Sequence, residues 1–104
     1  MLDEARLDAV PALVKLLDTD PTVPVIRALS VYREKARPGL ERLVTLMEDR
    51  DRPSEVRWNA VRTIAKMHAE GAPAVPALIP LIKDEELTVR EHAAEPVGDP
   101  GGLA

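Results

Sequence analysis

The chain has 104 residues, of which 45% are apolar and 31% charged, and this length suits a single domain. Its 14 Lys and Arg residues stand against 18 Asp and Glu residues, so a formal net charge of −4 provides no overall attraction to nucleic acid or anionic membranes. The absence of cysteine excludes disulfides and thiolate metal sites. The N-terminus is acidic where a signal peptide would be basic, and no apolar run approaches membrane-spanning length. We therefore expect a cytoplasmic protein without a membrane partner.

Residues 9–35 form the first predicted helical unit. The segment Ala-Val-Pro-Ala-Leu at residues 9–13 begins a helix, because the fixed φ of Pro11 suits a first turn, where its missing N–H is not needed. An acidic break at residues 18–21 ends this helix. A second helix follows, and its register stays open by one or two residues because Pro24 stands where the other units have Arg after Val.

Residues 36–71 form the second predicted unit. Pro38 lies near the start of its first helix, in a weaker copy of the same segment at residues 36–40. The second helix runs from Ser54, a suitable N-cap, to about Ala69, and Gly71 ends it. Helical spacing predicts that one stripe of this second helix is buried, formed by Val56, Ala60, Ile64 and Met67.

Residues 72–95 form the third predicted unit. The first segment recurs unchanged at residues 74–78, 65 residues after its first copy, and Pro76 again lies near a helix start. Pro80 should kink this helix or end its first turn. The second helix is predicted to be short, from about Thr88 to Glu95. Five of the nine residues in 96–104 are Pro or Gly, which predicts a disordered tail.

A second motif repeats in the same order as the first, since Val56-Arg57 and Val89-Arg90 lie 33 residues apart. The order of the two motifs, with an acidic turn between them, resembles the HEAT-like repeats that also occur in phycobilisome lyase subunits. The resemblance covers roughly residues 9–95, which we expect to form one domain within residues 1–95. It implies an all-α solenoid of three antiparallel helical hairpins wound into a right-handed superhelix, with second helices that line a concave face for a protein or peptide partner.

The polar face of the second helix in the middle unit provides the candidate binding site. Opposite its apolar stripe we expect Thr63 together with four candidate partner-binding residues, Trp58, Asn59, Arg62 and Lys66. Trp and Arg are enriched among residues that dominate binding energy, which favours a contact site at Trp58. In the alternative interpretation, Trp58 covers the seam between neighbouring hairpins as ordinary packing.

The repeated arginines Arg57 and Arg90 could pair with turn carboxylates such as Asp51 or Asp84, and the resemblance implies that such an Arg joins stacked units. As surface pairs they would contribute only about 0 to 1 kcal/mol each. Several cations could also form a basic strip along the concave face: Arg27, Arg33, Lys35, Arg37, Arg57, Arg62 and Lys66. Such a strip would suit an acidic partner, but scattered cations usually mark a solvated helix face, so nucleic acid is not favoured.

The sequence contains no recognisable catalytic constellation. His68 and His92 are isolated, and no phosphate-binding loop or nucleophile motif is present. We therefore expect an interaction module or adaptor, without enzyme activity, metal or cofactor. Two alternatives stay open, a ligand- or chromophore-handling accessory protein of the lyase type and a nucleic-acid-binding protein. Apolar surface at the ends of a short solenoid also predicts association with another copy or with a larger partner.

Overall fold

A computed structural model describes the backbone of residues 2–98 and the side chains of residues 9–98. All regular elements in this range are α-helices or 3₁₀-helices. In chain order they are α1 (Leu2–Thr19), α2 (Val23–Ser30), η1 (Arg33–Gly39), α3 (Leu40–Glu48), α4 (Ser54–Ala65), η2 (His68–Ala74), α5 (Val75–Leu78), η3 (Ile79–Lys83) and α6 (Leu87–Gly98).

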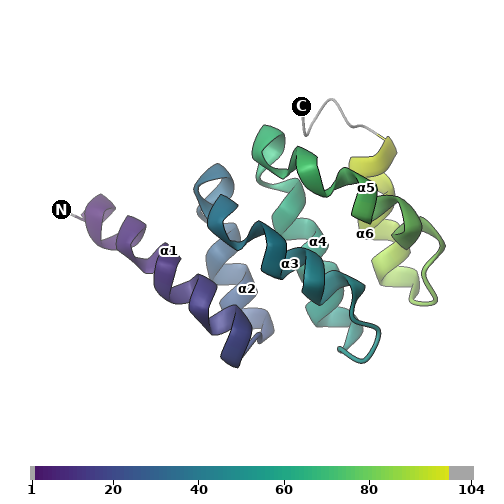
Figure 1. Ribbon diagram of the computed structural model, residues 1–104, viewed down its shortest axis with the longest axis horizontal. Helices are drawn as coiled ribbons and strands as arrows, with labels where there is room; N and C mark the ends of the chain where they lie inside the picture. Colours follow the sequence, from purple (N-terminus) through teal and green to yellow (C-terminus); the bar gives the residue numbers. More distant parts are fainter. Residues whose placement is uncertain (1, 99–104) are drawn as a thin grey trace.

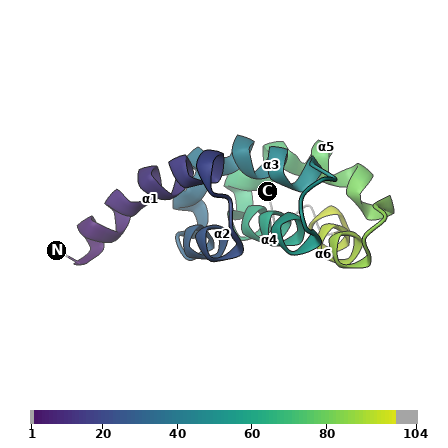
Figure 2. The ribbon, with the colours of Figure 1, turned by 90° about the horizontal axis from the view of Figure 1, so that it is seen from below.

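The helices form three hairpins stacked side by side (Figure 1). The first helices α1, α3 and α5 lie in one row, and the second helices α2, α4 and α6 lie in a row beneath it (Figure 2). Within the second row α4 packs between α2 and α6. The first row arches over the second, which places the second helices on the inner side of the curve (Figure 2). The predicted all-α solenoid of three hairpins is confirmed, and the handedness of its superhelix stays a prediction.

The core is aliphatic and continuous through the three hairpins. On α4 the predicted stripe of Val56, Ala60, Ile64 and Met67 is buried, as expected from its helical spacing. Leucine, isoleucine, valine and alanine supply most of the other buried side chains, from Val10 on α1 to Ala93 on α6. Because each hairpin covers the apolar face of its neighbour, the stack gains a core that no single hairpin could form.

The first unit differs from its prediction in both extent and register. Helix α1 begins at Leu2, and Pro11 lies in its middle rather than near its start. Leu13 is only half-buried, and Val14 takes the core position instead. In the third unit Leu78 is fully buried, so the two identical segments are one residue out of register. The reason is that α1 is one α-helix, whereas 3₁₀ turns, which have fewer residues per turn, flank α5.

The middle and third units are related by 35 residues, which also corrects the register predicted for the middle copy. Arg33 and His68 both have positive φ, 52° and 50°, and each begins a 3₁₀-helix of seven residues. Pro38 is therefore the counterpart of Pro73 rather than of Pro76. The predicted disruption at Pro80 is confirmed, since α5 gives way to η3 at Ile79.

The ends of two second helices also differ from expectation. Ser54 is the first residue of α4 and forms no cap, because Pro53 occupies the N-cap position. Helix α6 extends to Gly98, and Pro96 is buried, so the third hairpin is not truncated. The predicted disordered tail was wrong for residues 96–98, and its remaining part, 99–104, lies outside the described residues.

Candidate functional site

Helix α4 exposes only a narrow stripe of side chains because it is covered on three sides, by α3, α2 and α6. Three of the predicted site residues, Trp58, Arg62 and Lys66, lie on this stripe and are half-buried. Their spacing of four residues places them on one face of a helix. The structure thus brings together three of the four candidate residues.

The prediction that Asn59, the fourth candidate, lies on the exposed face was wrong. Its side chain is 2% exposed, and its Nδ2 donates a hydrogen bond to the carbonyl oxygen of Glu55 at 2.7 Å. Thr63, expected on the same polar face, is also buried and donates to the carbonyl oxygen of Asn59 at 2.8 Å. The prediction assumed one buried face, whereas a central helix in a stack buries its flanks as well. Short polar residues fit there because they bond to their own helix backbone.

Trp58 connects the second and third units. Its ring packs against the core and stacks on His92 of α6, with ring centroids 4.4 Å apart and an interplanar angle of 19°. His92 Nδ1 lies 2.7 Å from the carbonyl oxygen of Thr88, which holds the imidazole in place. The interpretation of Trp58 as the cover of a seam is therefore confirmed, and its role as a binding contact stays a prediction. His92 was missed because sequence spacing does not reveal pairs between helices.

Helix α2 carries a cation, Arg27, at the place that corresponds to Arg62 when the two helices are compared from their C-terminal ends. Arg27 and Arg62 are each the fourth residue from the C-terminal end of their helix, where a positive charge stabilises the helix dipole. Lys66 follows directly after α4 ends. Neither arginine nor Lys66 forms an ion pair with another described side chain. We call the set Arg27, Trp58, Arg62 and Lys66 the basic face.

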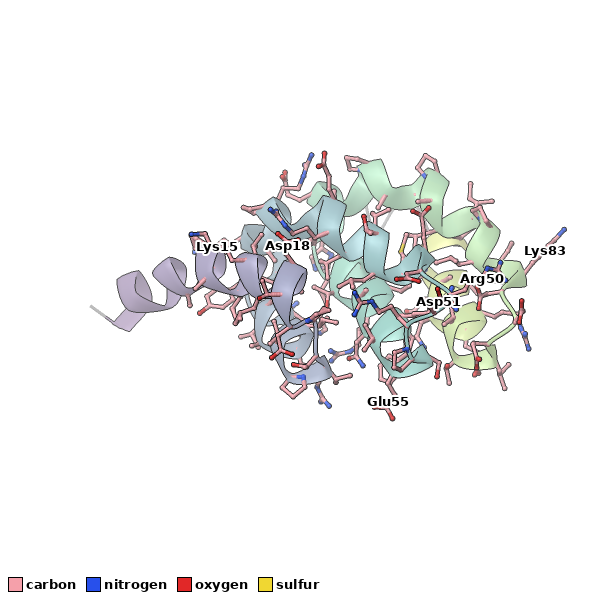
Figure 3. All side chains as sticks on the ribbon, turned by 60° about the horizontal axis from the view of Figure 1, so that its bottom comes forward. Lys15, Asp18, Arg50, Asp51, Glu55 and Lys83 are labelled. Carbon is pink, nitrogen blue, oxygen red and sulfur yellow. The ribbon has the colours of Figure 1, made fainter. Side chains whose placement is uncertain are left out.

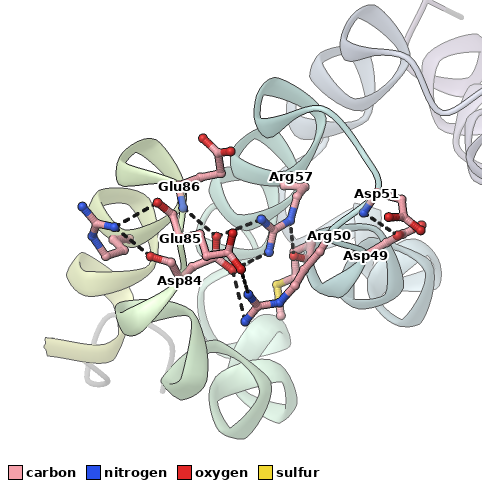
Figure 4. A network of polar contacts seen from close by, with 9 residues as sticks. Asp49, Arg50, Asp51, Arg57, Asp84, Glu85 and Glu86 are labelled. Atoms are coloured by element: carbon pink, nitrogen blue, oxygen red, sulfur yellow. Dashed lines mark hydrogen bonds and ion pairs between the residues drawn. The ribbon is translucent and has the colours of Figure 1, made fainter.

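A buried ion pair joins the second and third units below the surface (Figure 4). Arg57 donates from Nη1 and Nη2 to the two carboxylate oxygens of Asp84, at 2.8 and 2.7 Å. Its Nε donates to the carbonyl oxygen of Met47 at 2.9 Å, so three donors are used. The two side chains are 3% and 0% exposed. The prediction that Arg57 forms a surface pair was therefore wrong, because the pair is buried, although Asp84 was one of the two predicted partners.

Both members of the pair stay charged despite their burial. The hydrogen bonds from Arg57 lower the pKa of Asp84 from 3.8 to about 2, against the effect of burial, and the backbone N–H of Glu86 contributes in the same direction. The carboxylate likewise raises the pKa of Arg57. Asp51, the other predicted partner, is exposed, and its backbone N–H donates to Asp49 (Figure 4). The pair is closed to solvent and therefore joins units rather than binding ligands.

A family model described as HEAT repeats matches residues 40–102, which is more than half of the chain. The chain belongs to the HEAT repeat family. HEAT repeats commonly mediate protein interactions. The match includes both partners of the buried pair, Arg57 and Asp84, so that pair joins two successive HEAT units. No curated protein and no solved structure matches the chain, and the finer resemblance to phycobilisome lyase subunits stays a prediction.

Hollows of this HEAT repeat protein that are lined by described residues include two away from the basic face. One lies between α3 and the η2–α5 segment, with Arg37, Leu40, Val44 and Ala77 among its lining residues. The other lies where the turn after α1 meets the turn before α4. Among residues 9–98, no group of three His, Asp or Glu side chains could hold a metal ion. No helix described in residues 2–98 is both long and apolar enough to cross a membrane.

Proposed function

We propose that this HEAT repeat protein is a small interaction module or adaptor that binds an acidic protein partner through the basic face. The observation that carries the proposal is the repeated placement of Arg27 and Arg62 near the C-terminal ends of adjacent second helices, with Lys66 one turn after Arg62 and Trp58 one turn before it. A partner helix or loop with carboxylates at matching intervals would pair with these cations.

The chemistry of the basic face supports binding rather than internal stabilisation. A half-buried Arg or Lys lays its aliphatic part on apolar surface and presents its charge to solvent, so Arg62 and Lys66 need little ordering when a partner binds. Trp58 is also held in place, by its stack on His92. An aromatic side chain held in place beside cations has the composition of residues that dominate binding energy.

Exposed carboxylates near the N-terminal end of α4, away from the basic face, also support an acidic partner. The turns that lead into α4 and α6 carry many exposed carboxylates, and Glu55 projects from the start of α4 (Figure 3). These residues are Glu48, Asp51, Glu55, Glu85 and Glu86. The basic face lies toward the other end of α4, so the two ends of this helix differ in sign. An acidic partner would be attracted to one end and repelled from the other, which fixes its orientation.

The test begins with affinity purification from the source cell with three forms of the chain. Each recovered protein is then purified separately, and its affinity for each of the three forms is measured. Arg62→Glu/Lys66→Glu reverses the charge of two of the three cations of the basic face. Lys15→Glu/Lys83→Glu is the matched control, because it changes the net charge equally at exposed positions on α1 and η3 (Figure 3). We expect a partner that binds wild type and the control equally and binds Arg62→Glu/Lys66→Glu at least about tenfold more weakly. Its affinity for wild type should fall as the salt concentration rises.

Recovery of the same proteins with all three forms would show that the basic face binds no protein. Steeply salt-dependent binding to mixed-sequence DNA, lost in Arg62→Glu/Lys66→Glu, would favour the nucleic-acid alternative instead. We also propose that the chain acts in the cytoplasm without catalysis, and a co-purifying small molecule that is turned over would contradict the second statement. The proposed association of solenoid ends involves other residues than the basic face.

A further inference from the structure

The row of second helices changes its charge from one end to the other. Helices α2, α4 and α6 lie side by side on the inner side of the curve, with α4 in the middle (Figure 2). Arg27 of α2 and Arg62 of α4 are each the fourth residue from the C-terminal end of their helix. The residue at the same place in α6 is Glu95. At this position the row therefore carries two positive charges followed by a negative one.

The equivalence of Arg27 and Arg62 does not depend on the helix ends alone. Each arginine is followed six residues later by a residue of positive φ, which is Arg33 after α2 and His68 after α4. The residue directly before each arginine is apolar and 0% exposed. The two arginines therefore lie on the same face of their helices.

Helices α4 and α6 can be compared residue by residue, because each has 12 residues. Their third residues are both valine, their seventh residues are both alanine, and all four are buried. Arg62 and Glu95 are both the ninth residue. Glu91 is the fifth residue of α6, the place that Trp58 has in α4. Since equal spacing from buried positions places residues on the same face, the two glutamates continue the basic face onto α6 with the opposite charge.

These charges are not neutralised by other described side chains. Glu91 and Glu95 are exposed, and neither forms an ion pair with a described side chain. The same holds for Arg27 and Arg62. A partner that lies across the row can therefore pair with charges of both signs.

We propose that the partner of the basic face crosses the row as an extended polypeptide segment, with acidic residues over α2 and α4 and basic residues over α6. This inference rests on the proposed function and adds the charge order of the partner. Axes of packed helices lie about 8 to 10 Å apart, and an extended chain advances about 3.3 Å per residue. The segment thus meets successive helices at intervals of about three residues, so it carries acid, acid and base at i, i+3 and i+6.

The charge order gives a selectivity that net charge alone does not give. A uniformly acidic segment would pair over α2 and α4 but would meet Glu91 and Glu95 with like charge, which weakens binding. Nucleic acid is disfavoured for the same reason, because its phosphates recur along the whole strand. The glutamates of α6 therefore select a segment that changes sign.

Two synthetic peptides of equal composition test this order. The acid–acid–base peptide is Glu-Glu-Ser-Glu-Glu-Ser-Lys-Lys, and the acid–base–acid peptide is Glu-Glu-Ser-Lys-Lys-Ser-Glu-Glu. Both have blocked termini, so their net charges are equal. Titrations at low salt, followed by the fluorescence of Trp58, the single tryptophan of the chain, measure both affinities. We expect wild type to bind the acid–acid–base peptide at least about threefold more tightly than the other.

Glu91→Lys/Glu95→Lys should abolish this preference, because it makes α6 positive like its neighbours. Glu41→Lys/Glu48→Lys is the matched control, since it changes the net charge equally on α3, in the other row of helices. The control should keep the preference of wild type. All four positions are exposed, so neither variant removes a core contact.

Equal affinities of wild type for the two peptides would overturn the proposed charge order. So would a preference that survives in Glu91→Lys/Glu95→Lys, or the absence of binding to either peptide. Arg62→Glu/Lys66→Glu separates this inference from the proposed function. If wild type binds both peptides equally and this variant binds both more weakly, the basic face binds acidic segments and only the charge order is wrong. If this variant binds both peptides as wild type does, the basic face is not the binding surface and both proposals fail.

Discussion

Replacement of Arg57 by Met tests whether the buried ion pair holds the second and third hairpins together. Methionine keeps an unbranched side chain in the same space but removes the charge and all donors. Asp84, whose side chain is 0% exposed, would retain the hydrogen bond from the Glu86 N–H at 3.0 Å. The carbonyl oxygen of Met47 would lose the donor that now lies 2.9 Å away. The variant therefore leaves a buried carboxylate without its counter-ion.

The expected loss follows from the cost of an unpaired buried charge. Removal of one partner from a buried pair commonly costs about 3 to 5 kcal/mol. Arg50 Nη2 lies 3.8 Å from Asp84 Oδ1 and offsets part of this cost, so we expect a loss of about 3 kcal/mol. A domain of this size is stabilised by only about 5 to 15 kcal/mol. Arg57→Met should therefore lower the free energy of unfolding by a large fraction of its total.

Urea unfolding followed by circular dichroism measures this loss, and Arg42→Met is the matched control. Arg42 Nε lies 2.9 Å from both carboxylate oxygens of Asp18, so this pair is nearly as short as the buried one, whose distances are 2.8 and 2.7 Å. Its side chains are 42% and 54% exposed, and an exposed pair of this kind contributes only about 0 to 1 kcal/mol. The two variants thus remove similar contacts and differ in burial.

Equal losses in Arg57→Met and Arg42→Met would refute the reasoning, because burial would then add nothing to the cost of losing the partner. The variant Arg57→Met/Asp84→Leu provides a second check. Apolar residues in place of a buried pair are often neutral for stability, so this double variant should recover much of the loss. If it were instead less stable than Arg57→Met, lost packing rather than the unpaired charge would explain the effect.

Two further predictions concern acid stability and close packing. Because the pKa of Asp84 is lowered from 3.8 to about 2, its charged form stabilises the fold above about pH 4, and this contribution disappears as pH falls toward 2. The difference in unfolding free energy between wild type and Asp84→Asn should therefore shrink by about 2 kcal/mol over that interval in urea titrations, and a constant difference would contradict the assignment. A Cβ at Gly71 would lie 2.5 Å from the carbonyl oxygen of Ile64, so Gly71→Ala should lower stability by about 1 to 3 kcal/mol. Gly98→Ala, where no atom lies within 4 Å, should leave the thermal unfolding temperature unchanged, and equal behaviour of both variants would show that Gly71 is not confined.

Local features of the fold could be predicted because they depend on a few neighbouring residues. The apolar stripe of α4 follows from helical spacing, and the disruption at Pro80 follows from a missing N–H. The hairpin repeat was evident from two motifs that recur in order. Register between units was not predictable in this way, since identical segments at Leu13 and Leu78 differ in burial once 3₁₀ turns rotate one of them.

In the candidate site, too, features within a single helix could be predicted, whereas features that depend on neighbouring helices could not. Trp58, Arg62 and Lys66 were found because their spacing places them on one face of a single helix. The burial of Asn59 depends on neighbouring helices on both flanks of α4, which no pattern within α4 reveals. Arg27 was predicted as part of a longer strip, but its equivalence to Arg62 requires the positions at which both helices end.

The difference between the two internal junctions suggests what the buried pair contributes. Among the described side chains the first junction has no buried ion pair, so hairpins of this protein can stack without one. A buried pair adds little net stability over apolar residues, but a misaligned stack would leave both charges buried and unpaired. Aliphatic helix faces discriminate poorly between neighbouring registers. We therefore infer that Arg57 and Asp84 select the register of the third hairpin, and that this register is what brings His92 against Trp58 beside the basic face.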